Sequence, residues 1–231
     1  AGHGVSVTNT QSKTKDKPPR FQILSLDGGG IRGVFSAATL AAIEADLNIA
    51  IADHFDLIAG TSTGGIIALG LGLGLSPKDI LKFYTEKGPQ IFSNRFGWRG
   101  LLHWVIRKYP DSDIEAALQS CFSEKLFGQS TKRLIISSYN IDTNNVYLFR
   151  TPHHESLRRD HKVQAWKIAR ATSAAPTFFP PYRGIDNIRL IDGGVWANNP
   201  TMLGIVEAQK FLDVKAEDIR VLSIGTGQDA Y

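Results

Sequence analysis

The most constraining feature of the sequence is an apolar stretch at residues 57–75, which carries six glycines and a central hydroxyl cluster of Thr61, Ser62 and Thr63. Its length approaches that of a membrane-spanning helix. The glycines and hydroxyl residues interrupt the apolar pattern, however, and clusters of small residues mark turns. We therefore expect a buried strand, a tight turn and a buried helix inside a globular domain.

The chain has 231 residues and is 42% hydrophobic, which is enough for one buried core and too little for two ordinary domains. We expect one domain at residues 21–231, preceded at residues 1–20 by a polar tail or expression remnant without the apolar core of a signal peptide. The single cysteine, Cys121, cannot form an internal disulfide, which favours a reducing, cytoplasmic setting. The net charge of +4 admits an anionic partner without requiring one.

Short apolar runs alternate with helical spacings of apolar residues along the chain. This alternation predicts a layered α/β domain with a mostly parallel central sheet flanked by helices. The runs predict strands at residues 21–26, 55–59, 134–138, 146–149, 188–191 and 219–224. Helices are expected at residues 34–47, from 65, at 77–87, from 111 or 112, at 163–172 and at 200–212.

A glycine-rich loop follows the first predicted strand, with the sequence Asp27-Gly-Gly-Gly-Ile-Arg-Gly33. Its glycine spacing matches the dinucleotide-binding fingerprint, but no acidic residue ends the second strand to hold a ribose. The backbone N–H groups of Gly28, Gly29 and Gly30, beside Arg32, could instead bind an oxyanion at a helix N-terminus. A purely structural turn is a third interpretation.

A Gly-x-Ser-x-Gly element, built of Gly60, Thr61, Ser62, Thr63 and Gly64, lies between an apolar strand and an apolar helix. A serine at the tip of such a turn needs tiny neighbours, and the helix dipole then favours negative charge on its hydroxyl. This context predicts that Ser62 is a nucleophile. The alternative is a helix N-cap serine without chemistry.

A serine nucleophile needs a base, and none of the six histidines follows residue 161. A Ser-His-Asp triad in the α/β-hydrolase order requires a histidine after the serine and the acid. His54 precedes Ser62 by eight residues and is expected at the opposite edge of the sheet. Asp192, which ends a short strand before Gly193 and Gly194, is the remaining candidate, unless it is only a turn residue.

The glycine loop, the serine elbow and the Asp192-Gly-Gly194 turn together resemble the patatin-like phospholipases, as do residues 171–176, 197–200 and 224–227. The resemblance covers about residues 21 to 228 and implies a three-layer patatin-like fold. It implies a Ser62–Asp192 dyad that releases fatty acids from membrane phospholipids, with Gly28, Gly29, Gly30 and Arg32 forming or supporting the oxyanion hole. No cofactor and no metal ion are implied.

Members of this family usually continue beyond the strand that ends here at residue 224, so we expect the domain to lack a C-terminal continuation. Some bacterial members are activated by cyclic oligonucleotides in antiphage defence, which makes such an activator one possible partner of this chain. A non-specific carboxylesterase, a nucleotide-binding module that uses the glycine loop, and a catalytically idle scaffold are the alternatives.

Two basic segments could face an anionic partner. Residues 87–110 hold five cations, no acids and several large aromatic side chains, a composition that suits peripheral contact with a membrane or an ordinary solvated loop. The residues predicted to face the membrane are Phe92, Arg95, Phe96, Trp98 and Arg99. Residues 150–170 carry six cations against Glu155 and Asp160, which suggests an anionic ligand or partner.

Overall fold

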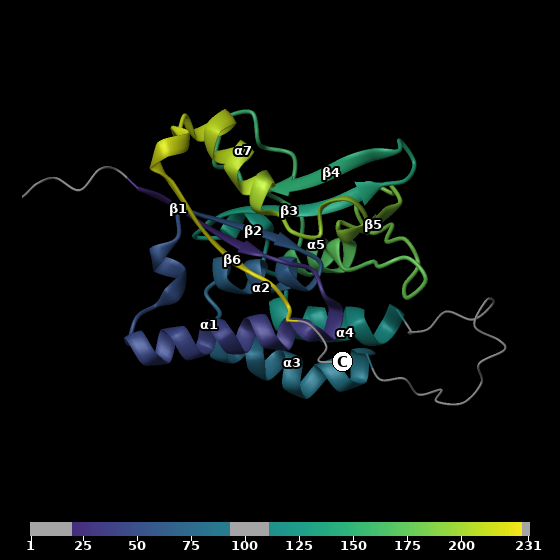
Figure 1. Ribbon diagram of the computed structural model, residues 1–231. Coiled ribbons are helices and arrows are strands. Elements are labelled where there is room, and N and C mark those ends of the chain that lie inside the picture. Colours follow the sequence, from purple (N-terminus) through teal and green to yellow (C-terminus); the bar gives the residue numbers. More distant parts are fainter. Residues whose placement is uncertain (1–19, 93–110, 228–231) are drawn as a thin grey trace, which may run out of the picture.

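The computed structural model describes residues 20–92 and 111–227 (Figure 1). Its strands are β1 (Phe21–Leu26), β2 (Leu57–Thr61), β3 (Arg133–Asn140), β4 (Asn145–Arg150), β5 (Leu190–Asp192) and β6 (Ile219–Ile224). Its α-helices are α1 (Gly33–Leu47), α2 (Thr63–Gly72), α3 (Pro77–Phe92), α4 (Asp111–Phe122), α5 (Ala165–Thr172), α6 (Gly194–Ala197) and α7 (Thr201–Leu212).

The strands form one sheet in the order β4-β3-β2-β1-β6, with β5 paired to β3. The pairings of β2 with β3, of β1 with β2 and of β1 with β6 are parallel, whereas β4 and β5 run antiparallel to β3. The sequence-based prediction of a mostly parallel sheet is confirmed.

Helices cover both faces of this sheet. Figure 1 shows α1 to α5 on one side and α7 on the other. Alternate strand residues face opposite layers, so Leu24 and Ile58 pack into the large core beneath α1 to α5, while Ile23 and Ala59 pack against Ala208 of α7. The central strand β2 is buried at every position, which explains why its sequence lacks the alternation of a half-exposed strand. The expected three-layer α/β fold is confirmed.

The register of β3 brings two distant segments together. β2 and β5 pair with the same edge of β3 but run in opposite directions, so that their C-terminal ends meet. The last residue of β2, Thr61, lies opposite Ser137, and the last residue of β5, Asp192, lies opposite the next residue, Ser138. Ser62 and Asp192 are therefore neighbours at the point where the two strands converge.

Several predicted boundaries differ from the structure, most of them by one or two residues. The strand expected at residues 55–59 is β2 at Leu57–Thr61, and the helix expected to end near Lys87 continues through Pro89 to Phe92. Proline removes one backbone hydrogen bond from a helix, but Tyr84 and Ile91 lie on one side of α3 and are buried in the large core. Within the described ranges no helix is long and apolar enough to cross a membrane.

Candidate active site

Ser62 occupies a sharp turn between β2 and α2. Its backbone angles are φ 53° and ψ −121°, in the left-handed half of conformational space that residues other than glycine rarely adopt. A Cβ atom at Gly64 would overlap the carbonyl oxygen of Leu26, and one at Gly60 would come within 2.5 Å of the Gly64 carbonyl oxygen. Only glycine fits on either side of the serine, as the sequence pattern predicted.

Hydroxyl groups from the neighbouring elements hold this elbow in place. The N–H of Ser62 donates to Thr172 Oγ1 at 2.9 Å, and that hydroxyl donates to the carbonyl oxygen of Ser137 at 2.6 Å. The Tyr84 hydroxyl hydrogen-bonds Thr63 Oγ1 at 2.5 Å. Such contacts offset the cost of a strained backbone, about 1–3 kcal/mol. Sequence analysis did not predict that Thr172 and Tyr84 support the elbow, although Thr172 lies in the family-like segment at residues 171–176.

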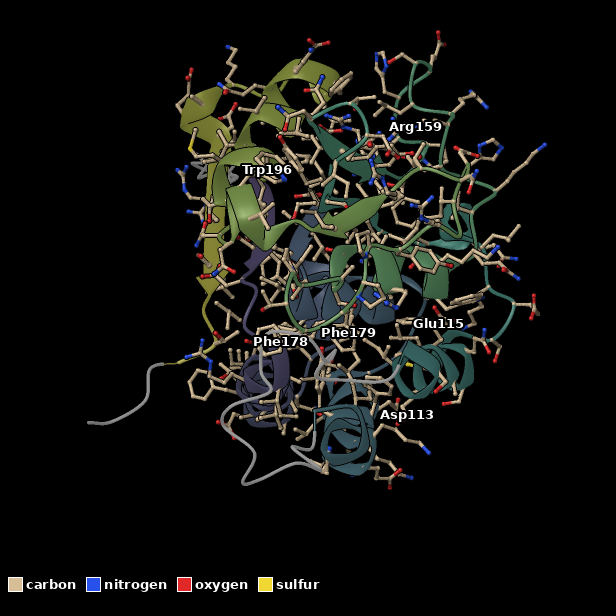
Figure 2. All side chains as sticks on the ribbon, turned by 90° about the vertical axis from the view of Figure 1, so that its right-hand side faces the viewer. Asp113, Glu115, Arg159, Phe178, Phe179 and Trp196 are labelled. Atoms are coloured by element: carbon tan, nitrogen blue, oxygen red, sulfur yellow. The ribbon has the colours of Figure 1, made fainter. Side chains whose placement is uncertain are left out.

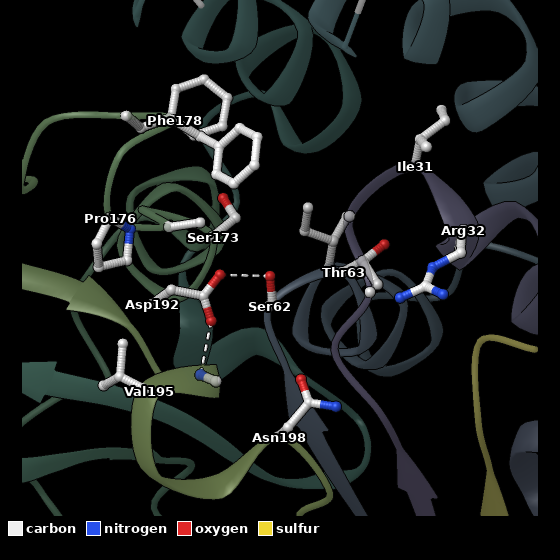
Figure 3. A pocket seen from close by; sticks show the side chains of 16 residues that line it. Ile31, Arg32, Ser62, Thr63, Ser173, Pro176, Phe178, Asp192, Val195 and Asn198 are labelled. Atoms are coloured by element: carbon white, nitrogen blue, oxygen red, sulfur yellow. Dashed lines mark hydrogen bonds between the residues drawn. The ribbon is translucent and has the colours of Figure 1, made fainter. Parts of the chain in front are cut away.

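The Ser62 hydroxyl donates a hydrogen bond to Asp192 Oδ2 at 2.6 Å (Figure 3). The second carboxylate oxygen, Oδ1, accepts the N–H of Gly194 at 2.7 Å, which fixes the orientation of the carboxylate. Both side chains of the pair are buried. The predicted nucleophile and the predicted base are thus in direct contact, in the geometry that proton transfer between them requires.

Burial changes the basicity of Asp192. Removal of the carboxylate from water raises its pKa to about 6, and the hydrogen bonds from Ser62 and Gly194 oppose this rise. A carboxylate with a pKa near 6 is still ionised at neutral pH, yet it is a much stronger base than a free aspartate, whose pKa is about 3.9. The site thereby supplies basicity without a histidine.

The glycine loop borders the same site but its members have different roles. The N–H of Gly28 donates to the carbonyl oxygen of Asn198 at 3.0 Å, and a Cβ at Gly28 would lie 3.3 Å from Ser62 Cβ. Gly28 therefore packs behind the nucleophile. Gly29 and Gly30 line the cavity in front of Ser62, as does the exposed Arg32. The N–H groups of Gly29 and Gly30 are the better placed candidates for an oxyanion hole.

A cavity of about 520 Å³ opens in front of the Ser62–Asp192 pair. Pockets of this size hold ligands of moderate size through apolar contacts and a few polar groups. Phe178 and Pro176 lie on one side of Ser62 and Ile31 lies on the other (Figure 3). The described residues that form the apolar wall are Ile31, Ile66, Ala175, Pro176, Phe178, Phe179 and Val195.

Comparison with known proteins agrees with this geometry. Residues 24–205 match the family model described as patatin-like phospholipase. The chain belongs to the patatin-like phospholipase family. It is 38% identical to a "cGAMP-activated phospholipase" of Pseudomonas aeruginosa over 90% of this chain and 63% of that protein, and 37% identical to one of Escherichia coli over 91% and 64%.

Structure comparison supports the same fold. VipD from Legionella pneumophila matches with a TM-score of 0.54 at 13% identity, over 90% of this chain and 50% of VipD. At such low identity the match concerns the fold alone. Because the chain spans just under two thirds of the length of the two curated relatives, the activity of a whole patatin-like protein is taken up below as a proposal.

The histidine that sequence analysis rejected as a base does not line the cavity of this patatin-like chain. His54 lies just before β2, where its carbonyl oxygen accepts the side-chain amide of Gln22, at the opposite edge of the sheet as expected. Phe92 ends α3. The remaining predicted membrane contacts, Arg95, Phe96, Trp98 and Arg99, lie outside the described residues, as do residues 1–19 of the expected tail.

The basic segment at residues 150–170 is less available to an anionic partner than its composition suggested. Arg150 pairs with Glu207 at 2.9 Å, Arg159 with Asp160 at 2.7 Å, and the buried Arg170 with Glu115 at 3.6 Å. Arg150 and Arg170 pair with residues from distant parts of the chain, so a local count of charges does not reveal these two pairs. Half of the six cations in this segment serve the fold.

The described residues offer little alternative chemistry. Burial raises the pKa of the Cys121 thiol to about 11, which leaves the thiolate scarce at neutral pH and agrees with an inert cysteine. Within the ranges that the structure covers, no three His, Cys, Asp or Glu side chains gather closely enough to hold a metal ion. Acyl transfer by Ser62 and Asp192 is the chemistry that the arrangement can perform.

Proposed function

We propose that this chain hydrolyses the acyl esters of membrane phospholipids through a dyad of Ser62 and Asp192. The observation that carries the proposal is the 2.6 Å hydrogen bond from Ser62 Oγ to a buried carboxylate, at the mouth of an apolar cavity. A structural N-cap serine would donate or accept within its own helix, but Ser62 makes no side-chain cap bond to α2. Membership of the phospholipase family supports the same substrate class.

In the first half-reaction Asp192 Oδ2 takes the Ser62 proton while Ser62 Oγ attacks the ester carbonyl carbon. The carbonyl oxygen becomes an oxyanion, to which the N–H groups of Gly29 and Gly30 would donate from the cavity wall. Each such donor contributes about 10²- to 10³-fold in rate. Protonated Asp192 then gives its proton to the leaving alcohol, and an acyl-serine ester remains.

In the second half-reaction Asp192 accepts a proton from water, whose oxygen attacks the acyl-serine carbonyl carbon. Collapse of the tetrahedral species returns the proton to Ser62 and releases the fatty acid. The apolar wall of the cavity suits an acyl chain, since burying each methylene contributes about 0.8 kcal/mol. A polar headgroup would remain near the solvent, beside Arg32.

The decisive experiment compares the parent chain with Ser62→Ala and Ser173→Ala, the two serines among the described residues that line the cavity. A fluorophosphonate probe should label the parent and the Ser173 variant but not the Ser62 variant. Mass spectrometry should detect fatty acid released from mixed phospholipid vesicles by the parent and the Ser173 variant, but not by the Ser62 variant. Hydrolysis of short soluble esters without release from phospholipid would assign a carboxylesterase instead, and a lack of labelling at Ser62 would assign a scaffold.

We further propose that a cyclic oligonucleotide activates the enzyme in antiphage defence. The support is the printed name of the relatives at 37–38% identity, "cGAMP-activated phospholipase". Fatty acid release should rise when cGAMP is added to the enzyme and vesicles, and should stay at the basal rate with an unrelated linear dinucleotide. An equal rate with and without cGAMP would contradict activation by this ligand.

A further inference from the structure

Three exposed apolar side chains line the mouth of the cavity, and a fourth lies close to one of them along the chain. We define the apolar rim as Ile31, Phe35, Phe178 and Val195, whose exposed fractions are 41%, 53%, 37% and 48%. Ile31 lies in the turn that leads into α1 and Phe35 in the first turn of α1, while Phe178 lies in the loop after α5 and Val195 in α6. Phe35 follows Ile31 by four residues, which places the two about one helical turn apart.

The position of the rim distinguishes it from other exposed apolar residues. Single exposed hydrophobic side chains are normal on soluble proteins, whereas clusters mark interaction surfaces. Ile31, Phe178 and Val195 all line the cavity that holds Ser62, and Ile31 and Phe178 lie on opposite sides of it (Figure 3). Figure 2 shows the face of the molecule on which Phe178 and the adjacent Phe179 lie.

We propose that the apolar rim docks the enzyme on the surface of a lipid bilayer, so that an acyl chain passes from the membrane into the cavity without crossing water. This inference rests on the proposed phospholipase function and names the surface that function uses. It involves none of the residues from 95 to 99 that composition had suggested.

The location of the rim decides between a bilayer and a protein partner. A protein bound over all sides of the mouth would block the path to Ser62, but a bilayer supplies the substrate through that path. Arg32 is exposed between Ile31 and the first turn of α1, where its guanidinium can meet an anionic headgroup. Apolar side chains around a cation are the usual composition of an interfacial membrane contact.

The test measures binding to vesicles of phosphatidylethanolamine and phosphatidylglycerol by co-sedimentation, in a Ser62→Ala background so that the vesicles stay intact. Ile31→Ser combined with Phe35→Ser should weaken binding about tenfold, because both apolar side chains lose their transfer into the interface. Leu47→Ser combined with Val206→Ser is the matched control. These residues are 63% and 50% exposed, at the far end of α1 and on α7 across the sheet, and their loss should change binding less than twofold.

A variant that retains the apolar character of the rim separates a loss of binding from a folding defect. Phe35→Trp retains an apolar ring, and tryptophan favours the membrane interface, so binding should be at least as tight as in the parent. Phe35 does not line the cavity, so Phe35→Ser in the active enzyme should lower hydrolysis of vesicles while leaving hydrolysis of a short soluble ester unchanged.

Each outcome bears on one proposal. Equal vesicle binding by the rim variant and the parent, equal losses in the rim and control variants, or no binding by the parent would overturn the docking surface. The proposed phospholipase function would be untouched by these results if the active parent still releases fatty acid from phospholipid dispersed in detergent micelles and accepts the fluorophosphonate probe. Failure of those two assays would instead remove the proposed function itself.

Discussion

Two buried carboxylates of this protein have opposite surroundings. Asp192 lies at the C-terminal edge of the sheet, where its partners are the Ser62 hydroxyl and the Gly194 N–H. Glu207 lies on α7 beneath the other face of the sheet, only 1% exposed, where Arg150 Nε donates to its carboxylate at 2.9 Å and His153 Nε2 lies 3.1 Å from it. One carboxylate has neutral donors, and the other has a cation and an imidazole.

The difference separates the proposed catalytic base from a carboxylate that stabilises the fold. Arg150 and Glu207 form an ion pair, which uses the carboxylate to join two elements of the fold. Among the described residues, Asp192 accepts hydrogen bonds from neutral donors only. Burial therefore outweighs these bonds and raises the pKa of Asp192 to about 6. Glu207 joins α7 to β4 through Arg150 and stabilises the layer opposite the cavity.

The strongest way to break this comparison is to neutralise Asp192. Asp192→Asn keeps the shape and can still hydrogen-bond Ser62 and Gly194, but it cannot accept the serine proton. We expect kcat/KM for phospholipid to fall by about 10³- to 10⁴-fold, the upper range for loss of a general base. Activity within tenfold of the parent, in a variant that still unfolds in one cooperative transition, would show that another group is the base.

The corresponding change at the other carboxylate should affect stability rather than catalysis. Glu207→Gln leaves the guanidinium of Arg150 without its anion, and breaking a buried ion pair costs about 3–5 kcal/mol. Urea unfolding should show this loss, while kcat of the folded fraction stays at the parent value. The matched control is Glu86→Gln, which breaks the exposed pair with Lys82 at 3.8 Å and should cost less than about 0.5 kcal/mol. Equal costs for the two variants would contradict the role of burial.

Neutralising Asp192 should also stabilise the fold above pH 6. Its pKa is about 6 in the folded protein and about 3.9 in an unfolded chain, so the folded state binds the proton more tightly and loses stability as pH rises between these values. At pH 8 the ionised form costs about 3 kcal/mol, which Asp192→Asn removes. Urea unfolding should show this gain at pH 8 and about 1 kcal/mol at pH 4.5. An equal gain at both pH values would contradict the raised pKa.

The sequence singled out Ser62 and Asp192, the proposed catalytic pair, because local signals mark each member. Gly60 and Gly64 flank a strained serine, and the strand that ends at Asp192 is followed by two glycines. The contact between them depends on β2 and β5 meeting along β3, a long-range pairing that no local pattern encodes. For the same reason the pairing of Arg150 with Glu207 was missed, since 57 residues separate its two members.

The apolar rim was also beyond the reach of sequence reasoning. Composition drew attention to residues 87–110 because cations and aromatics are adjacent there in the chain. The rim residues Ile31, Phe178 and Val195 are far apart in sequence and each looks ordinary in its own segment. They lie close together only because a turn, a loop and the short helix α6 meet around the cavity.

The last prediction concerns the pH dependence of the reaction, which tests the difference between Asp192 and Glu207 in the parent protein. Asp192 must be deprotonated to accept the Ser62 proton, and its pKa is about 6. The value of kcat/KM should therefore be constant above pH 7 and fall about tenfold for each pH unit below 6. Glu207→Gln should leave this limb unchanged, because Glu207 and Arg150 lie on the other side of the sheet. A limb near pH 4 in the parent, as for a solvated aspartate, would contradict the assignment of a desolvated Asp192 as the base.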